Sequence, residues 1–227
     1  MKKLTVTGKF SLGKGLIAAF AGFVVIGGGA WALNQQKTED PQALACSSST
    51  NTTKNLKSLT TGEVAAFLPA EKPLNLSELQ FHDADGNLVT MGDLKGTKLL
   101  NLWATWCAPC RKEMPHLDNL QRQAGGEDFN VIAVNMDRGE GNQKPLEFLE
   151  EIGVKDLAYF SDHTMKTFND LRTKGKAPGL PSTILIGEDG CEIGTMFGPA
   201  DWASPEAFEL INAALAGQKE NQTAQTD

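Results

Sequence analysis

Residues 102–115 read LWATWCAPCRKEMP, and they decide the fold because two cysteines stand between a predicted strand and a predicted helix. Lys98 to Ala104 is a short apolar run, which is typical of a buried strand. Apolar residues then recur at helical spacing from Met114 to Ala124, before two glycines. Cys107 is therefore expected at the start of a helix, and Cys110 one turn further in.

Strands and helices alternate on both sides of this segment. The expected elements are a hairpin around Asp85-Gly86, strands at Asn130–Met136 and Leu157–Phe160, helices near Pro145–Ile152 and Met165–Leu171, two strands around a turn at Asp189-Gly190, and a final helix from Ser204-Pro205-Glu206 to about Ala216. This order predicts an α/β fold with a mixed central sheet and helices on both faces.

Charge is distributed unevenly along the 227 residues. The formal net charge is −7, and setting aside the four lysines of residues 1–14 leaves −11 on the remainder, in which Glu39 is the first acidic residue. An acidic body offers no basic stripe to neutralise phosphates, so we expect no nucleic-acid partner. The composition, 41% hydrophobic and 22% charged, is that of a globular protein.

Residues 15–33 are nineteen uncharged residues, and a helix of that length spans roughly 28 Å, close to the thickness of a bilayer core. We expect a single uncleaved span in a bacterial inner (cytoplasmic) membrane. A removed signal peptide is the alternative, since Ala30-Trp31-Ala32 resembles a cleavage site. In both cases the lysine-rich residues 1–14 stay in the cytoplasm, and the body is exported to the periplasm, where disulfides persist.

Polar stretches on both sides delimit the expected domain. Residues 34–61 and 218–227 show no sustained periodicity, so we predict a periplasmic tether and a disordered tail. Residues 62–217 form the predicted domain, which we expect to be monomeric.

The cysteine pair allows three interpretations. A zinc site needs four ligands, and this chain offers three histidines and no second C-x-x-C. A static structural disulfide is the second possibility. The third is a redox pair, because the free N–H groups and dipole of a helix start favour a thiolate at Cys107. Arg111 and Lys112 add positive charge, Pro109 stiffens the turn, and Cys110 could attack a mixed disulfide formed by Cys107. We favour this redox role, with no metal and no cofactor.

Several motifs resemble the thioredoxin superfamily. They are WATWCAPCRKEMPHLDNLQ at 103–121, with Pro115 five residues after Cys110, and Gly179-Leu180-Pro181-Ser182-Thr183 at the start of a strand. The anchor, DGCEI at 189–193 and GPADWAS at 198–204 narrow the resemblance to membrane-anchored thiol–disulfide interchange proteins of the TlpA type.

This resemblance implies a thioredoxin-like fold with an added N-terminal hairpin and a central insertion, here Gln143–Phe160. It also implies a cis-proline at Pro181, beside which the backbone of Leu180 pairs with an extended substrate segment, while Trp106 and Leu180 form an apolar rim. Asn101 departs from thioredoxin, which has a buried aspartate there, so the group that deprotonates Cys110 stays open.

Cys46 and Cys191 complete an even count, which suggests pairing in an oxidising compartment. The TlpA resemblance implies the same second disulfide. The rival interpretation, a lipid on Cys46, is disfavoured because Cys46 lies about a dozen polar residues beyond the apolar segment.

The resemblance implies a periplasmic thiol–disulfide oxidoreductase that receives electrons from a membrane donor and reduces disulfides in exported proteins. Copper-site assembly proteins of cytochrome oxidase are the expected targets. Two alternatives stay open: a disulfide-forming oxidase, because the reduction potential sets the direction, and a copper carrier using the Cys107 and Cys110 thiolates. His163 and Met165 are a weak local pair for such a carrier, and we favour solvent-facing or core positions for both side chains.

Overall fold

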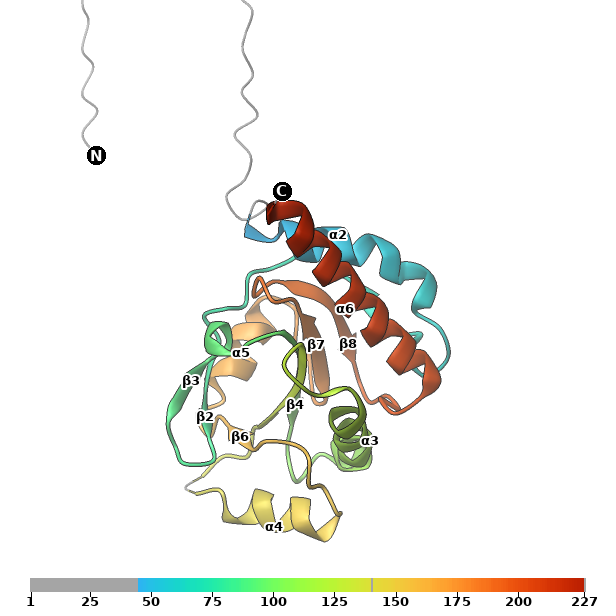
Figure 1. Ribbon diagram of the computed structural model, residues 1–227. Coiled ribbons are helices and arrows are strands. Elements are labelled where there is room, and N and C mark those ends of the chain that lie inside the picture. Colours follow the sequence, from blue (N-terminus) through green and yellow to red (C-terminus); the bar gives the residue numbers. More distant parts are fainter. Residues whose placement is uncertain (1–44, 140, 227) are drawn as a thin grey trace, which may run out of the picture. The chain divides into compact units, whose positions relative to one another are not determined.

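The computed structural model describes residues 45–139 and 141–226, and these form a mixed sheet with helices on both faces (Figure 1). The sheet has eight strands in the order β1-β8-β7-β4-β5-β6-β2-β3. The strands are β1 Leu68–Pro69, β2 Gln80–Asp83, β3 Leu88–Thr90, β4 Thr97–Trp103, β5 Phe129–Asn135, β6 Phe160–Ser161, β7 Ser182–Ile186 and β8 Glu192–Phe197. The helices are α2 Ser47–Leu56, α3 Ala108–Ala124, α4 Gln143–Glu151, α5 Lys166–Thr173 and α6 Pro205–Thr226, with 3₁₀ turns η1 Lys57–Leu59, η2 Gly62–Val64 and η3 Met91–Asp93. The predicted α/β class and mixed sheet are confirmed.

The centre of the sheet is buried on both faces. Strand β4 runs parallel to β5 and antiparallel to β7, and all seven of its residues are buried. Successive β4 side chains belong to opposite cores: Leu99 and Trp103 to one, Leu100 and Leu102 to the other. Double burial explains why β4 reads as an apolar run and not as an alternating pattern.

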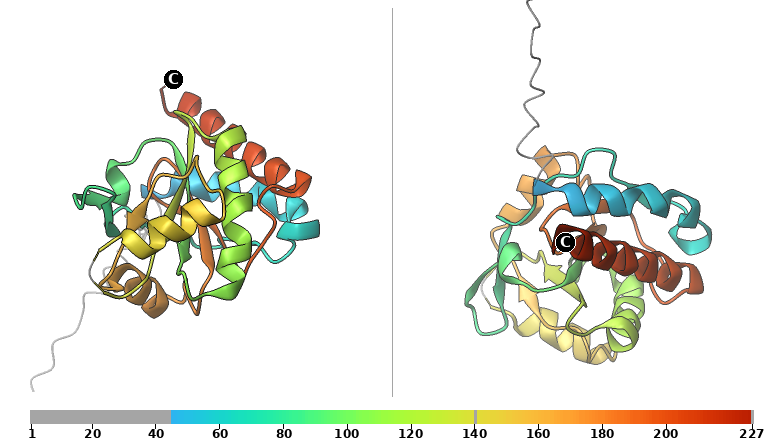
Figure 2. Two further views of the ribbon diagram at one scale, coloured as in Figure 1. Left: turned by 90° about the horizontal axis from the view of Figure 1, so that it is seen from below. Right: turned by 45° about the horizontal axis from the view of Figure 1, so that its top comes forward.

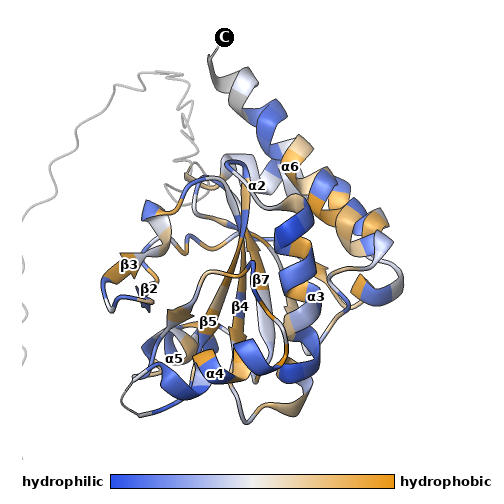
Figure 3. Ribbon diagram, turned by 60° about the horizontal axis from the view of Figure 1, so that its bottom comes forward, coloured by the Kyte–Doolittle hydropathy of each residue, from blue (hydrophilic) through white to orange (hydrophobic). Residues whose placement is uncertain are grey.

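Two hydrophobic cores lie on the two faces of the sheet. One contains buried side chains from α3, α4 and α6, and the other contains side chains from α5 and from the segment that leads into β2. The views in Figure 2 show these helices on either side of the strands. In Figure 3 the hydrophobic colour gathers in the central strands, whereas much of α3 is hydrophilic.

Both predicted hairpins are present. Strands β2 and β3 pair antiparallel, with Phe81 opposite Val89, and the carboxylate of Asp83 accepts hydrogen bonds from the backbone N–H groups of Asp85 and Asn87 in the turn. Strands β7 and β8 form the second hairpin, in which Gly190 has a φ of +75° that favours glycine.

The predicted tether is wrong over its described part. From Ser47 the chain forms α2, which packs beside α6 (Figures 1 and 2). The buried face of α2 is largely polar, and its partners are distant in sequence: the Ser49 hydroxyl donates to Asp189 Oδ1 (2.6 Å), and Gln218 Nε2 donates to Thr52 Oγ1 (2.9 Å). A helix held by such contacts has no hydrophobic periodicity for the sequence to reveal.

The predicted disordered tail is wrong as well. Helix α6 continues to Thr226 instead of ending near Ala216. Gln218 is buried against α2, and the Asn221 side chain donates to the carbonyl oxygen of Ser48. The last turns of α6 are therefore stabilised by α2, which the sequence had assigned to a tether.

Two further predictions concern a short strand and the membrane anchor. The short strand expected at Leu157–Phe160 is β6, shifted to Phe160–Ser161. The predicted anchor at residues 15–33 lies outside the described residues. Within residues 45–139 and 141–226, no helix has both the length and the apolar character needed to cross a bilayer.

Candidate redox site

The cysteine pair stands where β4 leads into α3. Cys107 is the N-cap of α3, and its Sγ accepts a hydrogen bond from the backbone N–H of Cys110 (3.3 Å). The two sulfurs form a disulfide, so the site is in its oxidised form. Cys107 is 5% exposed and Cys110 is fully buried. Cys107 is therefore mostly covered, yet it is the more accessible of the two cysteines.

The loop before Cys107 is fixed to the end of the neighbouring strand. Both carboxylate oxygens of Asp137 accept from the backbone N–H of Thr105 (3.2 Å each), and Asp137 also accepts from Asn135 Nδ2 (3.1 Å). The Met136 N–H donates to the carbonyl oxygen of Trp103 (2.7 Å). Because β4 and β5 are parallel and end together, these contacts hold Cys107 at their carboxyl edge.

The predicted proline loop reaches the same edge. The Leu180–Pro181 peptide bond is cis, as expected, and β7 begins beside the end of β4, with Ser182 opposite Leu102. Leu180 is half-buried and packs against both cores, while Trp106 is 66% exposed. Phe197, in register with Ser182, adds an exposed aromatic ring beside the loop. The sequence did not single out Phe197.

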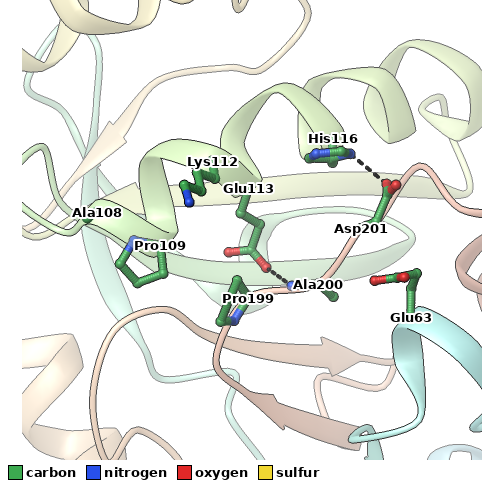
Figure 4. A pocket seen from close by; sticks show the side chains of 9 residues that line it. All are labelled: Glu63, Ala108, Pro109, Lys112, Glu113, His116, Pro199, Ala200 and Asp201. Carbon is green, nitrogen blue, oxygen red and sulfur yellow. Dashed lines mark hydrogen bonds and ion pairs between the residues drawn. The ribbon is translucent and has the colours of Figure 1, made fainter.

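The two predicted cations face different surroundings. The guanidinium of Arg111 lies over the ring of Phe148 in α4, 4.7 Å from its centroid. Lys112 and Pro109 line a pocket of about 490 Å³ on another side of α3 (Figure 4). Their influence on the redox pair stays a prediction.

A buried carboxylate lies one helical turn beyond Cys110. Glu113 is 1% exposed and accepts three hydrogen bonds. Its Oε1 accepts from Trp202 Nε1 (2.7 Å) and from the Ala200 N–H (3.1 Å), and its Oε2 accepts from Asn101 Nδ2 (3.1 Å). Figure 4 shows Glu113 directed from α3 toward the loop at Ala200.

Burial and hydrogen bonding shift the pKa of Glu113 in opposite directions. Burial dominates and raises the pKa of Glu113 from 4.5 to about 7, while the hydrogen bonds from Trp202, Ala200 and Asn101 lower it. A carboxyl group whose pKa lies near neutrality can take up and release a proton at working pH. Asn101 thus supports a buried carboxylate on α3 instead of supplying one from β4, and Glu113 is the candidate for the proton-accepting group that the sequence left open.

The sequence carries a signal for Glu113 in the spacing of the buried residues of α3. Cys110, Glu113, Met114 and Leu117 fall at helical positions i, i+3, i+4 and i+7, and all four are buried. A glutamate on the apolar stripe of a helix, one turn after a reactive cysteine, is a candidate for a proton-transfer group. Trp202 and Ala200 carried no comparable signal, because they reach Glu113 only through the tertiary fold.

His163 and Met165 have other partners. The two ring nitrogens of His163 contact the carbonyl oxygen of Asp137 and the side-chain oxygen of Asn142 (2.8 Å each). Met165 Sδ accepts from Arg138 Nε (3.0 Å). These contacts favour a structural role for both side chains over the metal-ligand role considered for a copper carrier.

The second disulfide expected from the sequence is present. Cys46 and Cys191 are bonded and nearly fully buried, and they join the start of α2 to the turn between β7 and β8. This bond lies next to the Ser49–Asp189 contact, so a covalent and a polar link fix the same end of α2.

A thioredoxin-like domain with a disulfide at the start of α3 is thus defined, and residues 67–211 match the Redoxin family. The chain belongs to the Redoxin family. It is 31% identical over 110 residues to the thiol-disulfide oxidoreductase ResA of Bacillus subtilis, covering 48% of this chain and 57% of ResA. It is 45% identical over 116 residues to the thioredoxin-like protein YneN of the same organism, and this match covers 49% of this chain and 65% of YneN. The matches therefore span less than two thirds of these relatives.

Solved structures show the same fold. A putative thiol:disulfide interchange protein DsbE from Chlorobium tepidum matches with a TM-score of 0.52 and 25% identity, covering 62% of this chain and 95% of that one. A thioredoxin family protein from Chlorobium tepidum TLS matches with a TM-score of 0.51 and 21% identity, covering 63% and 97%, and shows the fold alone. The predicted resemblance to thiol:disulfide interchange proteins of the thioredoxin superfamily is confirmed.

Proposed function

We propose that this protein is a thiol–disulfide oxidoreductase that reduces disulfides in exported proteins. The observation that carries the proposal is the Cys107–Cys110 disulfide at the N-terminus of α3, with the buried Glu113 one turn further along. A purely structural bridge has no need of a nearby carboxyl group with a pKa near 7.

The reaction has two exchange steps. The Cys107 thiolate attacks one sulfur of a target disulfide, which forms a Cys107–target disulfide and releases the other target sulfur as a thiolate. Cys110 then gives its proton to Glu113, and the Cys110 thiolate attacks Sγ of Cys107. The Cys107–Cys110 disulfide forms, and the second target sulfur leaves and is protonated. The target gains two electrons, and the cysteine pair loses two.

Each residue of the site has a role in this scheme. The helix start stabilises the Cys107 thiolate. Trp106 and Phe197 are exposed aromatic groups near the pair and the proline loop, suited to contact an extended target chain beside Leu180. The ionised form of Glu113, stabilised by Trp202, Ala200 and Asn101, accepts the proton of Cys110.

The setting is part of the same proposal. The uncharged residues 15–33 after a lysine-rich start support a protein anchored in the bacterial inner membrane with its domain in the periplasm. The buried Cys46–Cys191 disulfide supports an oxidising compartment. A membrane protein would supply the electrons, and the TlpA resemblance favours copper-site assembly proteins of cytochrome oxidase as targets.

The test is reduction of a peptide that contains one disulfide by the chemically reduced protein. We expect rapid exchange by the parent, and by a Cys46→Ser/Cys191→Ser control, but none by Cys107→Ser. Equal rates for the parent and Cys107→Ser would overturn the proposal. The measured reduction potential decides the direction: a potential too high to reduce exported proteins would favour the oxidase alternative.

A further inference from the structure

A second contact joins α3 to the loop that holds Glu113. His116 lies one turn after Glu113 on α3, and its Nδ1 is 2.6 Å from Oδ1 of Asp201 (Figure 4). Both side chains are about two-fifths exposed, at 40% and 39%. The pair borders the same pocket as Lys112 and Pro109.

Asp201 stands between the two loop residues that bind Glu113. Ala200 donates through its backbone N–H and Trp202 through its indole, and both bonds end on Glu113 Oε1. Three consecutive loop residues thus contact α3 at two points: Ala200 and Trp202 inward at Glu113, and Asp201 outward at His116. Asp201 also shapes the loop, since its Oδ1 accepts from the Ala203 N–H (2.9 Å).

We propose that the His116–Asp201 pair is a positioning contact that holds residues 200–202 against α3 and keeps both donors on Glu113 for the proton transfer from Cys110. The inference rests on the proposed function. His116 and Asp201 touch neither the cysteines nor a target in this scheme; they act through the loop.

The physical basis is the balance between burial and hydrogen bonding, which together set the pKa of Glu113. Burial disfavours its charged form, and the Trp202 and Ala200 hydrogen bonds favour it. If the His116–Asp201 contact is lost, the loop is held less tightly against α3. The Trp202 and Ala200 donors then move more freely and stabilise the Glu113 carboxylate less. The pKa of Glu113 then rises, and a smaller fraction of Glu113 is ionised and able to accept a proton near neutral pH.

The charged groups around the pair are few. Asp201 faces His116 from the loop, Lys112 lies one turn before it on α3, and Glu63 of η2 borders the pocket from a third side (Figure 4). An exposed pair of this kind contributes little to stability. Its removal should therefore leave the protein folded, which makes the contact testable.

The experiment measures the rate of exchange with the single-disulfide peptide from pH 5.5 to 9 for His116→Ala, Asp201→Ala and the double variant. A rise of half to one unit in the pKa of Glu113 lowers the rate about three- to tenfold at pH 6, and the loss disappears at alkaline pH. The rate of the double variant should fall no further than that of the slower single variant, because both changes break the same contact between His116 and Asp201. His116→Gln, which keeps a hydrogen-bond donor, should restore most of the rate.

Asp170→Asn is the matched control. It removes the Lys166–Asp170 ion pair on α5, in which Asp170 is 42% exposed, and its pH profile should superimpose on that of the parent. A second readout is the carboxyl ¹³C titration of Glu113 in the oxidised protein, which should move to higher pH in His116→Ala.

The outcomes separate the inference from the proposed function. Unchanged profiles and titrations in a parent that depends on Cys107 would overturn the positioning role and leave the oxidoreductase standing. A uniform loss of rate at every pH would also overturn it, because that result indicates a general structural effect. A parent without Cys107-dependent exchange would refute the proposed function itself.

Discussion

Glu113 lies one helical turn beyond Cys110 on α3, and both side chains are buried, at 1% and 0% exposure. The Glu113 carboxyl group and the Cys110 sulfur thus lie on the same face of α3, shielded from water. In such a setting a proton can pass between them without a charge entering the interior, because the thiolate that forms replaces the carboxylate that is neutralised. On the proposed mechanism, this relationship would let Cys110 be both shielded and reactive as the resolving cysteine.

The stability of the oxidised protein should fall as pH rises through the range in which Glu113 titrates. Between about 4.5 and 7 the folded state keeps the Glu113 proton while the unfolded state releases it, so the unfolded state binds fewer protons. The free energy of unfolding should fall by roughly 3 kcal/mol across this window. Urea unfolding at a series of pH values measures it.

The control is Glu113→Gln, measured in the same series. Whatever its offset in stability at low pH, this variant has no carboxyl group to titrate, so its slope between pH 4.5 and 7 should be smaller than that of the parent. Parallel slopes in the two proteins would show that Glu113 is not the buried acid.

Asn101→Ala should raise the pKa of Glu113 further. The change removes the hydrogen bond from Asn101 Nδ2 to Glu113 Oε2, which favours the charged carboxylate and so lowers the pKa. Burial, which raises the pKa, is then offset by fewer hydrogen bonds. We also expect a loss of about 2 kcal/mol in stability, since a buried hydrogen bond to a charged group is lost. The pH-dependent unfolding described above measures both effects.

Thr183→Val is the matched control for this change. Asn101 Nδ2 also donates to Thr183 Oγ1 (2.9 Å), and valine keeps the shape of threonine without that acceptor. We expect a loss of about 1 kcal/mol in stability with no movement of the Glu113 titration. If both variants move the titration equally, Asn101 does not act on Glu113 directly.

The two disulfides should open in a fixed order. Cys107 is flanked by the exposed residues Trp106 and Ala108, whereas Cys46 and Cys191 are nearly fully buried at the start of α2. A mild thiol reductant should therefore open Cys107–Cys110 first, as peptide mapping after differential alkylation would show. Earlier appearance of free Cys46 or Cys191 would contradict this order.

Loss of the second disulfide should affect stability and leave exchange intact. Cys46→Ser/Cys191→Ser should unfold at lower urea concentration, with a cost of roughly 3–5 kcal/mol for so long a loop. Its rate of peptide reduction per folded molecule should equal that of the parent, because Cys46 and Cys191 join the start of α2 to the β7–β8 turn and neither residue belongs to α3.

The sequence predicted the parts of the fold that follow from local pattern. The apolar run of β4, the helical spacing of α3 and the turn residues of both hairpins each indicate their element within a few residues. The cysteine pair and Pro181 were predicted from motifs that also lie within short windows.

The failures share a different physical cause. Helix α2 has a polar sequence, and its stability depends on Asp189 and Gln218, which lie more than a hundred residues away. Glu113 lies on the buried stripe of α3, but its hydrogen-bond partners Trp202 and Ala200 come from a loop near the end of the domain. Contacts of this kind exist only once the sheet has formed, so no local pattern encodes them.

The most direct test of the account is covalent trapping on the Cys110→Ser protein. If Cys107 is the attacking thiol and Cys110 the resolving one, the reduced variant should accumulate a mixed disulfide between Cys107 and the single-disulfide peptide, and target proteins should be captured in the same way from a periplasmic extract. Mass spectrometry of the adduct identifies the bonded cysteine. Adducts that form equally well in Cys107→Ser, through Cys110, would contradict the assignment of both thiols.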